Sequence, residues 1–299
     1  MTTSELAKKV RYIEITTKKA VTATFAGEYK SAFKGRGMEF DEVREYQTGD
    51  DIRTIDWNVT ARTGKLHTKR FMEERELTII FLVDLSSSGS FGSGTQSKRE
   101  LAAEVCALLA FSAIKNNDRV GLITFTDSVE LYIPPRKGST HVLRLIRELL
   151  ACRLEGPDPA STNIGFALDS FSRLFKRRAV VFLVSDFLDQ GFERQLKVVG
   201  RRHDLIAISL SDPREYEMPR VGFVELEDAE TGERVLLDTD SRTVRRAYQA
   251  VWTEKASALQ SLCRSAEIGY IGITAGEDYV RPLARFFLER ERQFKVRVR

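Results

Sequence analysis

The chain has 299 residues, of which 42% are hydrophobic and 30% are charged, and its formal net charge is +4. This length accommodates one large domain or two modest ones, and this composition excludes an intrinsically disordered chain. No apolar run approaches the ~20 residues of a membrane span, the first twenty residues lack a secretory apolar region, and three widely spaced cysteines indicate reduced thiols. We therefore expect a cytoplasmic protein without a membrane span.

The first 75 residues are charged and dotted with glycine, and only residues 4–15 show helical periodicity. We expect residues 1–75 to form an accessory, β-rich layer packed on the core. Trp57 is expected in the core. Three aspartates are expected to pair with nearby arginines and to fix this layer against the sheet: Asp50, Asp51 and Asp56.

From residue 76 to 290, strand and helix patterns alternate. Short apolar, β-branched runs predict strands over 76–84, 119–126, 129–133, 178–186, 204–210 and 268–274, the third of which should stop at Pro134. Apolar residues at helical spacing predict helices over 96–116, 139–152, 163–176, 191–200, 243–267 and 279–289. A hairpin insertion is expected near 221–238, and residues 291–299 form a basic tail. This alternation predicts an α/β fold with a doubly wound, mostly parallel sheet flanked by helices.

Hydroxyl and carboxylate side chains follow the strands of this predicted sheet. Asp84, Ser86 and Ser88 come directly after the first strand, Thr162 precedes a helix, and Asp186 ends a later strand. Ligands of doubly wound sheets bind beyond the carboxyl ends of the strands, so these five side chains are expected to converge. Their oxygens suit Mg²⁺ or Mn²⁺ and are poor ligands for soft metals.

The pattern D-x-S-x-S, followed by Thr162 and Asp186, resembles the metal-ion-dependent adhesion site of von Willebrand factor A domains. That resemblance implies a six-stranded, mostly parallel sheet. A second string resembles the bacterial family called domain of unknown function 58, whose members are often encoded with MoxR-type AAA+ ATPases. The string includes Gly35-x-Gly37-x-Glu39-Phe40, Arg44-Glu45-Tyr46 and Gly49-Asp50-Asp51-x-Arg53-x-Ile55-Asp56-Trp57.

These resemblances imply a non-catalytic, metal-dependent protein-binding adaptor. The hydroxyls of Ser86, Ser88 and Thr162 would bind Mg²⁺ directly, and Asp84 and Asp186 would hold it mainly through water. An acidic residue on a protein partner would complete the shell. The implied partner is a MoxR-type AAA+ ATPase, acting in assembly or maturation of a client protein.

Two other functions compete with this hypothesis. A metal-assisted phosphoesterase could use the same Mg²⁺ site, although the sequence offers no second carboxylate cluster at that edge. A nucleic-acid binder could use the basic tail, but basic and aromatic residues do not alternate there, so no nucleic acid is expected. A serine hydrolase is disfavoured because His141 and His203 fall away from the carboxyl ends of the strands, which leaves only His67 of the N-terminal region as its base.

Overall fold

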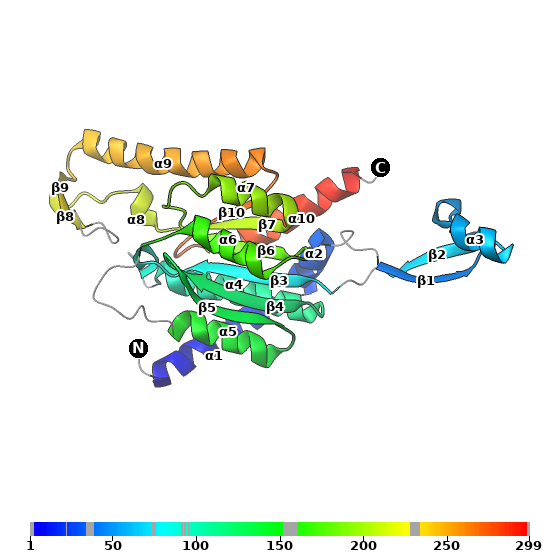
Figure 1. Ribbon diagram of the computed structural model, residues 1–299. Coiled ribbons are helices and arrows are strands. Elements are labelled where there is room, and N and C mark those ends of the chain that lie inside the picture. Colours follow the sequence, from blue (N-terminus) through cyan, green and yellow to red (C-terminus); the bar gives the residue numbers. More distant parts are fainter. Residues whose placement is uncertain are drawn as a thin grey trace.

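The computed structural model describes residues 3–21, 23–33, 39–72, 76–90, 92, 94, 96–151, 161–227 and 234–297. At its centre lies a six-stranded sheet with the order β10-β7-β6-β3-β4-β5 (Figure 1). Every neighbouring pair is parallel except β4 and β5. The strands are β3 (Thr78–Asp84), β4 (Arg119–Phe125), β5 (Val129–Arg136), β6 (Val180–Ser185), β7 (Asp204–Ser211) and β10 (Gly269–Thr274). The mostly parallel sheet is thereby confirmed, and its chain order 3-2-1-4-5-6 is that of doubly wound folds.

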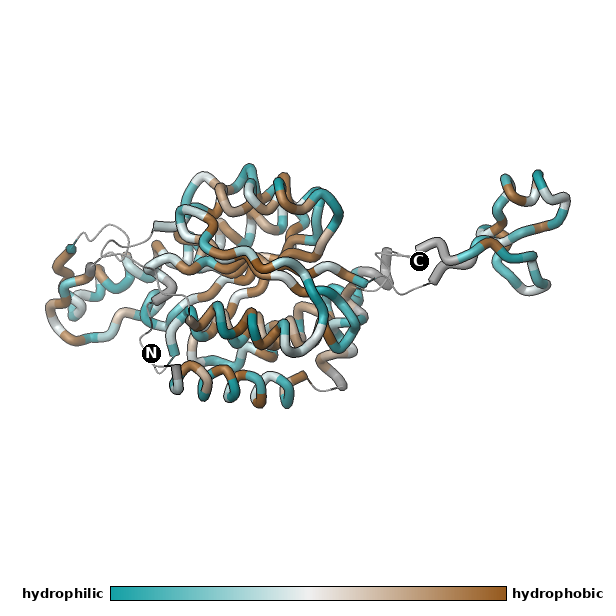
Figure 2. The backbone as a smooth tube through the Cα atoms, turned by 60° about the horizontal axis from the view of Figure 1, so that its bottom comes forward, coloured by the Kyte–Doolittle hydropathy of each residue, from teal (hydrophilic) through white to brown (hydrophobic). Residues whose placement is uncertain are grey.

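Helices cover both faces of this sheet (Figures 1 and 2). Along β3, Ile79, Phe81 and Val83 belong to one buried cluster and Ile80 and Leu82 to the other, as the alternation of a strand requires. The first face is covered by α1 (Thr3–Ala20), α2 (Ala23–Phe33), α4 (Lys98–Lys115), α5 (Ser139–Ala151) and α10 (Val280–Arg297). The second face is covered by α6 (Ile164–Leu174), α7 (Glu193–Arg202) and α9 (Arg242–Ser265).

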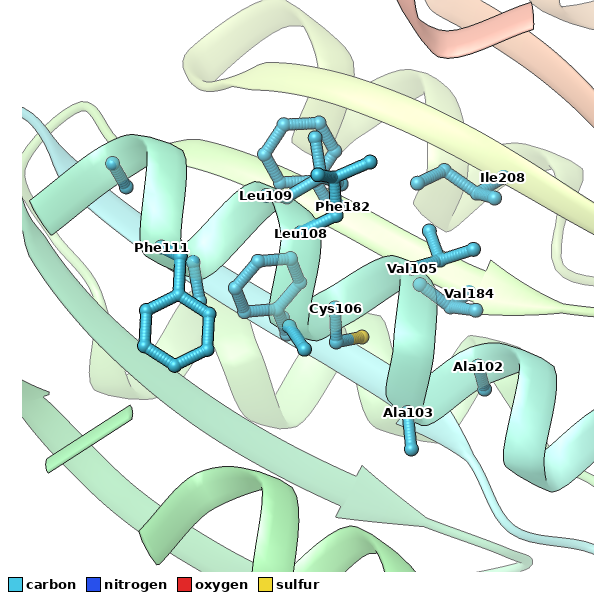
Figure 3. Packing of buried hydrophobic residues seen from close by; sticks show 14 of the residues in the cluster. Ala102, Ala103, Val105, Cys106, Leu108, Leu109, Phe111, Phe182, Val184 and Ile208 are labelled. Atoms are coloured by element: carbon cyan, nitrogen blue, oxygen red, sulfur yellow. The ribbon is translucent and has the colours of Figure 1, made fainter. Parts of the chain in front are cut away.

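Helix α4 lies at the centre of the first face and is apolar nearly all the way round. Such a helix must be buried on all sides, and α1 and α5 accordingly cover its outer surface. Its residues, including Val105 and Leu109, belong to the same cluster as Phe182 and Ile208 of the sheet (Figure 3). Ser97 caps its first turn by accepting the N–H of Glu100 at 3.3 Å. The first residue of α4 is therefore held rigidly beside the carboxyl edge of the sheet.

The N-terminal region has two parts that differ in their packing. Helices α1 and α2 lie on the core, where Phe25, Tyr29 and Phe33 surround Phe287 of α10 with ring centroids 5.5–5.8 Å apart. This part is helical and not β-rich, and α2 was not predicted from the sequence. The apolar face of α2 packs against α10, which lies some 250 residues later in the chain. Local periodicity in the sequence does not reveal such a distant contact.

The second part is an arm that projects from the body (Figures 1 and 2). It consists of β1 (Glu39–Glu45), the short helix η1 (Ile52–Thr54), α3 (Trp57–Thr63) and β2 (His67–Met72). Strands β1 and β2 pair with each other and with no strand of the large sheet. No apolar side chain described in the arm is buried. Trp57, predicted in the core, is 65% exposed, so that prediction is wrong.

The aspartates of the arm stabilise its own turns and not its contact with the sheet. Asp50 pairs with Arg44 at 2.6 Å, which agrees with the sequence prediction. Asp51 instead caps η1 through the N–H of Arg53. Asp56 caps α3 through two backbone N–H groups and lies 3.4 Å from Lys69. Local hydrogen bonds therefore replace a hydrophobic core in this arm.

Three boundaries in the structure differ from those predicted from the sequence. Strand β5 continues through Pro134 and ends at Arg136, which an edge strand permits because its outward N–H groups need no partner. The inserted hairpin is β8 (Phe223–Glu227) and β9 (Arg234–Asp238), with its turn outside the described residues. Helix α10 reaches Arg297, so the described part of the predicted tail continues that helix. In the part of the chain that the structure describes, we find no helix with the length and apolar character to cross a membrane.

Candidate functional site

Asp84, Ser86 and Ser88 meet at the carboxyl end of β3. Asp84 ends the strand, η2 (Ser87–Ser90) follows it, and the hydroxyl oxygens of Ser86 and Ser88 lie 3.0 Å apart. Asp84 Oδ1 accepts the backbone N–H of Ser86 at 2.9 Å, which turns the loop back over the strand end. These side chains line a cavity of ≈ 10 Å³. That volume is room for about one water molecule or ion.

Asp186 lines the same cavity from the end of β6, which is the neighbour of β3. The hydroxyl of Ser185 donates to Asp84 Oδ2 at 2.7 Å and accepts the N–H of Phe187 at 3.0 Å. Phe187 has a φ of 57°, a left-handed conformation that is unusual for a bulky residue. Its buried ring packs on Phe192 and holds this turn in place. Such local strain is concentrated at functional sites.

The carboxyl group of Asp84 lies in an unfavourable environment for a negative charge. Burial, followed by the negative charge of Asp186, raises the pKa of Asp84 to about 6, although hydrogen bonds from Ser185 and Ser86 act in the opposite direction. A buried carboxylate without a full counter-charge is stabilised by a cation. A cation beside Asp84 would therefore stabilise the charged form of its carboxyl group.

A buried lysine, which the sequence did not reveal, lies in the wall of this cavity. Lys98, the first residue of α4, is 2% exposed. Its ammonium group lies 2.7 Å from Asp186 Oδ2 and 2.7 Å from Glu215 Oε1. Glu215 belongs to the one-turn helix α8 (Pro213–Tyr216), where its other oxygen accepts the N–H of Asp212 at 2.9 Å. Lys98 thus connects the cavity to a helix that lies 117 residues later in the chain.

Thr162 lies in the loop 161–163, which precedes α6. The N–H of Asn163 donates to Thr126 O at 2.9 Å, just beyond β4, so this loop is at the same carboxyl edge as Asp84. Thr162 is half-buried, but it does not line the cavity of the other four residues. The structure therefore brings four of the five predicted residues together and leaves the fifth elsewhere along the same edge.

Asp84, Ser86, Ser88 and Asp186 fit a hard divalent cation, although the basic side chains of Lys98 and Arg99 line the same cavity. Two carboxylates and two hydroxyls are the oxygen ligands that Mg²⁺ accepts, with further positions left for water. Among the described residues no group of three or more His, Cys, Asp or Glu is arranged to hold a metal, so a cation here would need the serine hydroxyls as ligands besides the carboxylates. Lys98 already neutralises one oxygen of Asp186. A bound cation would therefore be held mainly by Asp84, Ser86 and Ser88.

The histidines that a hydrolase would need lie elsewhere. His141 Nε2 is 2.9 Å from Val120 O, near the amino end of β4. His203 precedes β7 at the same end, where burial lowers its pKa to about 4, and its Nδ1 accepts the N–H of Ala179. His67 belongs to the arm. None of the three lines the cavity.

Three features define the class of protein as a von Willebrand factor A-like α/β domain. They are the strand order, the antiparallel edge strand β5, and the D-x-S-x-S loop at the end of β3, where the strand order reverses. Within that class, residues 42–258 match the family model described as "Protein of unknown function DUF58". The chain belongs to this family.

Curated relatives are similar to this chain in sequence. Uncharacterized protein Rv1480 of Mycobacterium tuberculosis is 30% identical over 289 residues, which cover 96% of this chain and 90% of that protein. Uncharacterized protein YeaD of Bacillus subtilis is 25% identical over 62% of this chain and 43% of its own length.

Solved structures are similar at a greater distance. BatB from Bacteroides thetaiotaomicron has a TM-score of 0.45 and 13% identity, covering 72% of this chain and 99% of that chain. The SpRpn10 VWA domain has a TM-score of 0.41 and 11% identity, covering 70% of this chain and 94% of that chain. Similarity this distant supports no transfer of function.

Proposed function

We propose that this protein is a non-catalytic, cytoplasmic adaptor that binds a protein partner through a divalent cation held by Asp84, Ser86 and Ser88. The observation that supports this proposal is the convergence of these three side chains with Asp186 in one cavity at the carboxyl edge of the sheet. The raised pKa of Asp84 adds to it, because a group with that environment gains most from a neighbouring cation.

The surroundings of the cavity favour binding over catalysis. Its volume of ≈ 10 Å³ suits an ion and leaves no enclosed space for an organic substrate. Because Lys98 forms an ion pair with Asp186, few uncompensated negative charges face the position that a cation would take. Mg²⁺ bound there would supply an electrophilic centre that accepts an acidic side chain from outside. Ser86 and Ser88 would orient that position, and Ser185 would keep Asp84 in place by its hydrogen bond.

The partner that we propose is a MoxR-type AAA+ ATPase, with the adaptor acting in assembly or maturation of a client protein. This choice rests on the family to which the chain belongs, since its members are often encoded with such ATPases. An acidic side chain on the ATPase or on the client would complete the cation shell.

The first test is cation binding by the purified protein. Titration calorimetry with Mg²⁺ and Mn²⁺ should show one site in the wild type and none in Asp84→Asn or Ser86→Ala. Asp118→Asn is the matched control, because Asp118 is a second buried aspartate that lies at the amino end of β4. Absence of binding by the wild type at millimolar cation would refute the metal site.

The second test is partner binding. The MoxR-type ATPase encoded in the same organism should be retained by immobilised wild type in Mg²⁺, and lost with a chelator or with Asp84→Asn. Equal retention in all samples would refute metal dependence.

A phosphoesterase that uses the same cation is the rival proposal, and the carboxylate pair Asp84 and Asp186 is the observation in its favour. Steady release of phosphate from a model ester, abolished by Asp84→Asn and unaffected by Asp118→Asn, would establish the rival in place of the adaptor.

A further inference from the structure

The two edges of the central sheet differ in how they are protected. At one edge, β5 carries Pro134 and Pro135 and its register with β4 shifts twice. Prolines and bulges are common protection against pairing with another chain. At the other edge, β10 pairs with β7 in one unbroken register, from Gly269 opposite Ile206 to Thr274 opposite Ser211, and contains no proline. The second edge therefore lacks the protection that the first one has.

The outward backbone groups of β10 can be identified from one hydrogen bond. In a parallel pair, alternate residues direct both N–H and C=O to the same side. The N–H of Ala275 donates to Ser211 O at 2.8 Å, so residues of odd number face β7. Tyr270 and Gly272 consequently face outward, and so does the N–H of Thr274. No described residue hydrogen-bonds to the outward N–H or C=O groups of Tyr270 and Gly272.

A groove of ≈ 820 Å³ follows this edge. It is lined by β10, by the end of α9, including Arg264, and by the middle of α10, including Arg285 and Glu289. Helix α9 packs on one face of the sheet and α10 on the other. A groove that both helices line together with β10 must run along the edge between them.

Gly272 exposes the backbone at the floor of this groove. It is an exposed residue, whereas Ile271 and Ile273 on either side are buried. A glycine within a strand often marks the close approach of another backbone. Gly269 is different, because a Cβ atom there would lie 2.7 Å from the ring of Phe286, so packing within the protein already explains that glycine.

We propose that this groove binds an extended peptide segment of a protein partner, which adds a strand to the free edge of β10. Binding by strand addition needs an unpaired edge for main-chain hydrogen bonds and walls that contact alternate side chains, and both are present. The segment carries an acidic side chain that pairs with Arg264. This arginine is exposed and forms no ion pair with any described residue, whereas Arg285 is already paired with Glu289 at 2.8 Å.

A second copy of this chain does not fit the groove. Pairing two copies through β10 would bring a second α9 and a second α10 to the same edge, where the first two helices already form the walls. A single extended segment has no such flanking helices. The proposal is independent of the cation site, which lies at the ends of β3 and β6. Together with the proposed cation site, the groove would give an adaptor the two separate contacts that it needs to join two proteins.

The test uses the full chain and a display library of random short peptides, selected on wild type and counter-selected on Gly272→Pro. Proline removes the outward N–H of residue 272 and leaves the ladder to β7 intact, because the bonds of residue 272 do not face β7. Gly272→Ala is the matched control, since it keeps the N–H and adds one methyl group 3.3 Å from the Tyr270 hydroxyl. Circular dichroism and Mg²⁺ titration of each variant show whether the fold and the cation site are unchanged.

We expect acidic, β-branched peptides that bind the wild type and Gly272→Ala alike and bind Gly272→Pro at least tenfold more weakly, as measured by fluorescence anisotropy. Arg264→Glu should weaken the same peptides, and the Gly272 amide should exchange its hydrogen more slowly when a peptide is bound. Binding should survive a chelator. Peptides that bind Gly272→Pro equally well, or no enrichment over that variant, would overturn the proposal. A wild-type dimer in sedimentation that Gly272→Pro dissociates would also overturn it, in favour of a second copy as occupant.

Discussion

Replacing Lys98 by methionine should destabilise the protein far more than any surface lysine does. The ammonium group lies 2.7 Å from one oxygen of Asp186 and 2.7 Å from one oxygen of Glu215, and all three side chains are buried. Methionine has a similar length and no charge. The substitution therefore leaves two carboxylates in the interior without their shared cation.

The magnitude follows from these contacts. Removing one partner of a buried ion pair costs about 3–5 kcal/mol, because the remaining charge is left without compensation. Each carboxylate keeps one backbone hydrogen bond, to Asp212 N–H at 2.9 Å and to Leu188 N–H at 3.3 Å, which limits the loss. We expect the free energy of unfolding to fall by about 3–5 kcal/mol near pH 8.

The loss should depend on pH in a definite direction. Burial already raises the pKa of Glu215, with Lys98 opposing that shift, so the pKa of Glu215 rises further when the lysine is removed. A carboxyl group with a raised pKa in the folded state destabilises the fold as pH rises through that value. The deficit of Lys98→Met should therefore be small near about pH 5 and complete near about pH 8.

Urea unfolding of both proteins at several pH values measures this deficit by linear extrapolation. Lys115→Met is the matched control on the same helix, where Lys115 is exposed, and it should change stability by less than about 0.5 kcal/mol. Adding Glu215→Gln to Lys98→Met should recover part of the loss, because one unpaired carboxylate is removed. A deficit equal to that of the control, or one that grows as pH falls, would refute this reasoning.

Three further predictions can be tested with the same preparations. Burial raises the pKa of Asp118 to about 7, so the wild type should lose stability as pH rises through that value. Asp118→Asn keeps an acceptor for the N–H of Leu77 and should flatten this pH dependence in urea unfolding. An unchanged dependence of stability on pH would contradict the argument. Trp57→Ala should alter the free energy of unfolding by less than about 0.5 kcal/mol, whereas Phe182→Ala in the core should lower it by about 3–5 kcal/mol. A large loss of stability with Trp57→Ala would show that this side chain is buried and not exposed. Affinity for Mg²⁺ should weaken as pH falls through about 6, where a proton competes at Asp84, and calorimetry that shows constant affinity over this range would exclude Asp84 as a ligand.

The strands of the core were predictable from the sequence because they are buried on both faces. The run that forms β3 and the run that forms β6 are apolar without interruption, which identifies central strands of a parallel sheet. Asp84 and Asp186 follow these strands directly, so their meeting at one edge was also predictable. The metal itself stays a prediction.

The features that the sequence did not reveal depend on contacts between distant segments. Lys98 follows a helix cap, where an exposed lysine is usual, and its burial depends on Glu215 far along the chain. The face of α2 is recognisable only once α10 lies beside it. The aspartates near Trp57 were expected to pair with arginines and fix this layer against the sheet. Asp50 does pair with Arg44, but Asp51 and Asp56 cap local turns, and the tryptophan is exposed.

The arm has one consequence for the way this protein can change. At its base Glu39 pairs with Met72, so the chain leaves the body and returns to it at neighbouring points, roughly 5 Å apart in an antiparallel pair. The arm is therefore a segment inserted between α2 and β3, and neither of its strands pairs with the large sheet. Its length, its tip and its exposed tryptophan can change without altering the contacts among Asp84, Ser86 and Ser88 at the carboxyl edge of the sheet. Changes in the arm and changes at the carboxyl edge of the sheet can accordingly arise separately within one polypeptide.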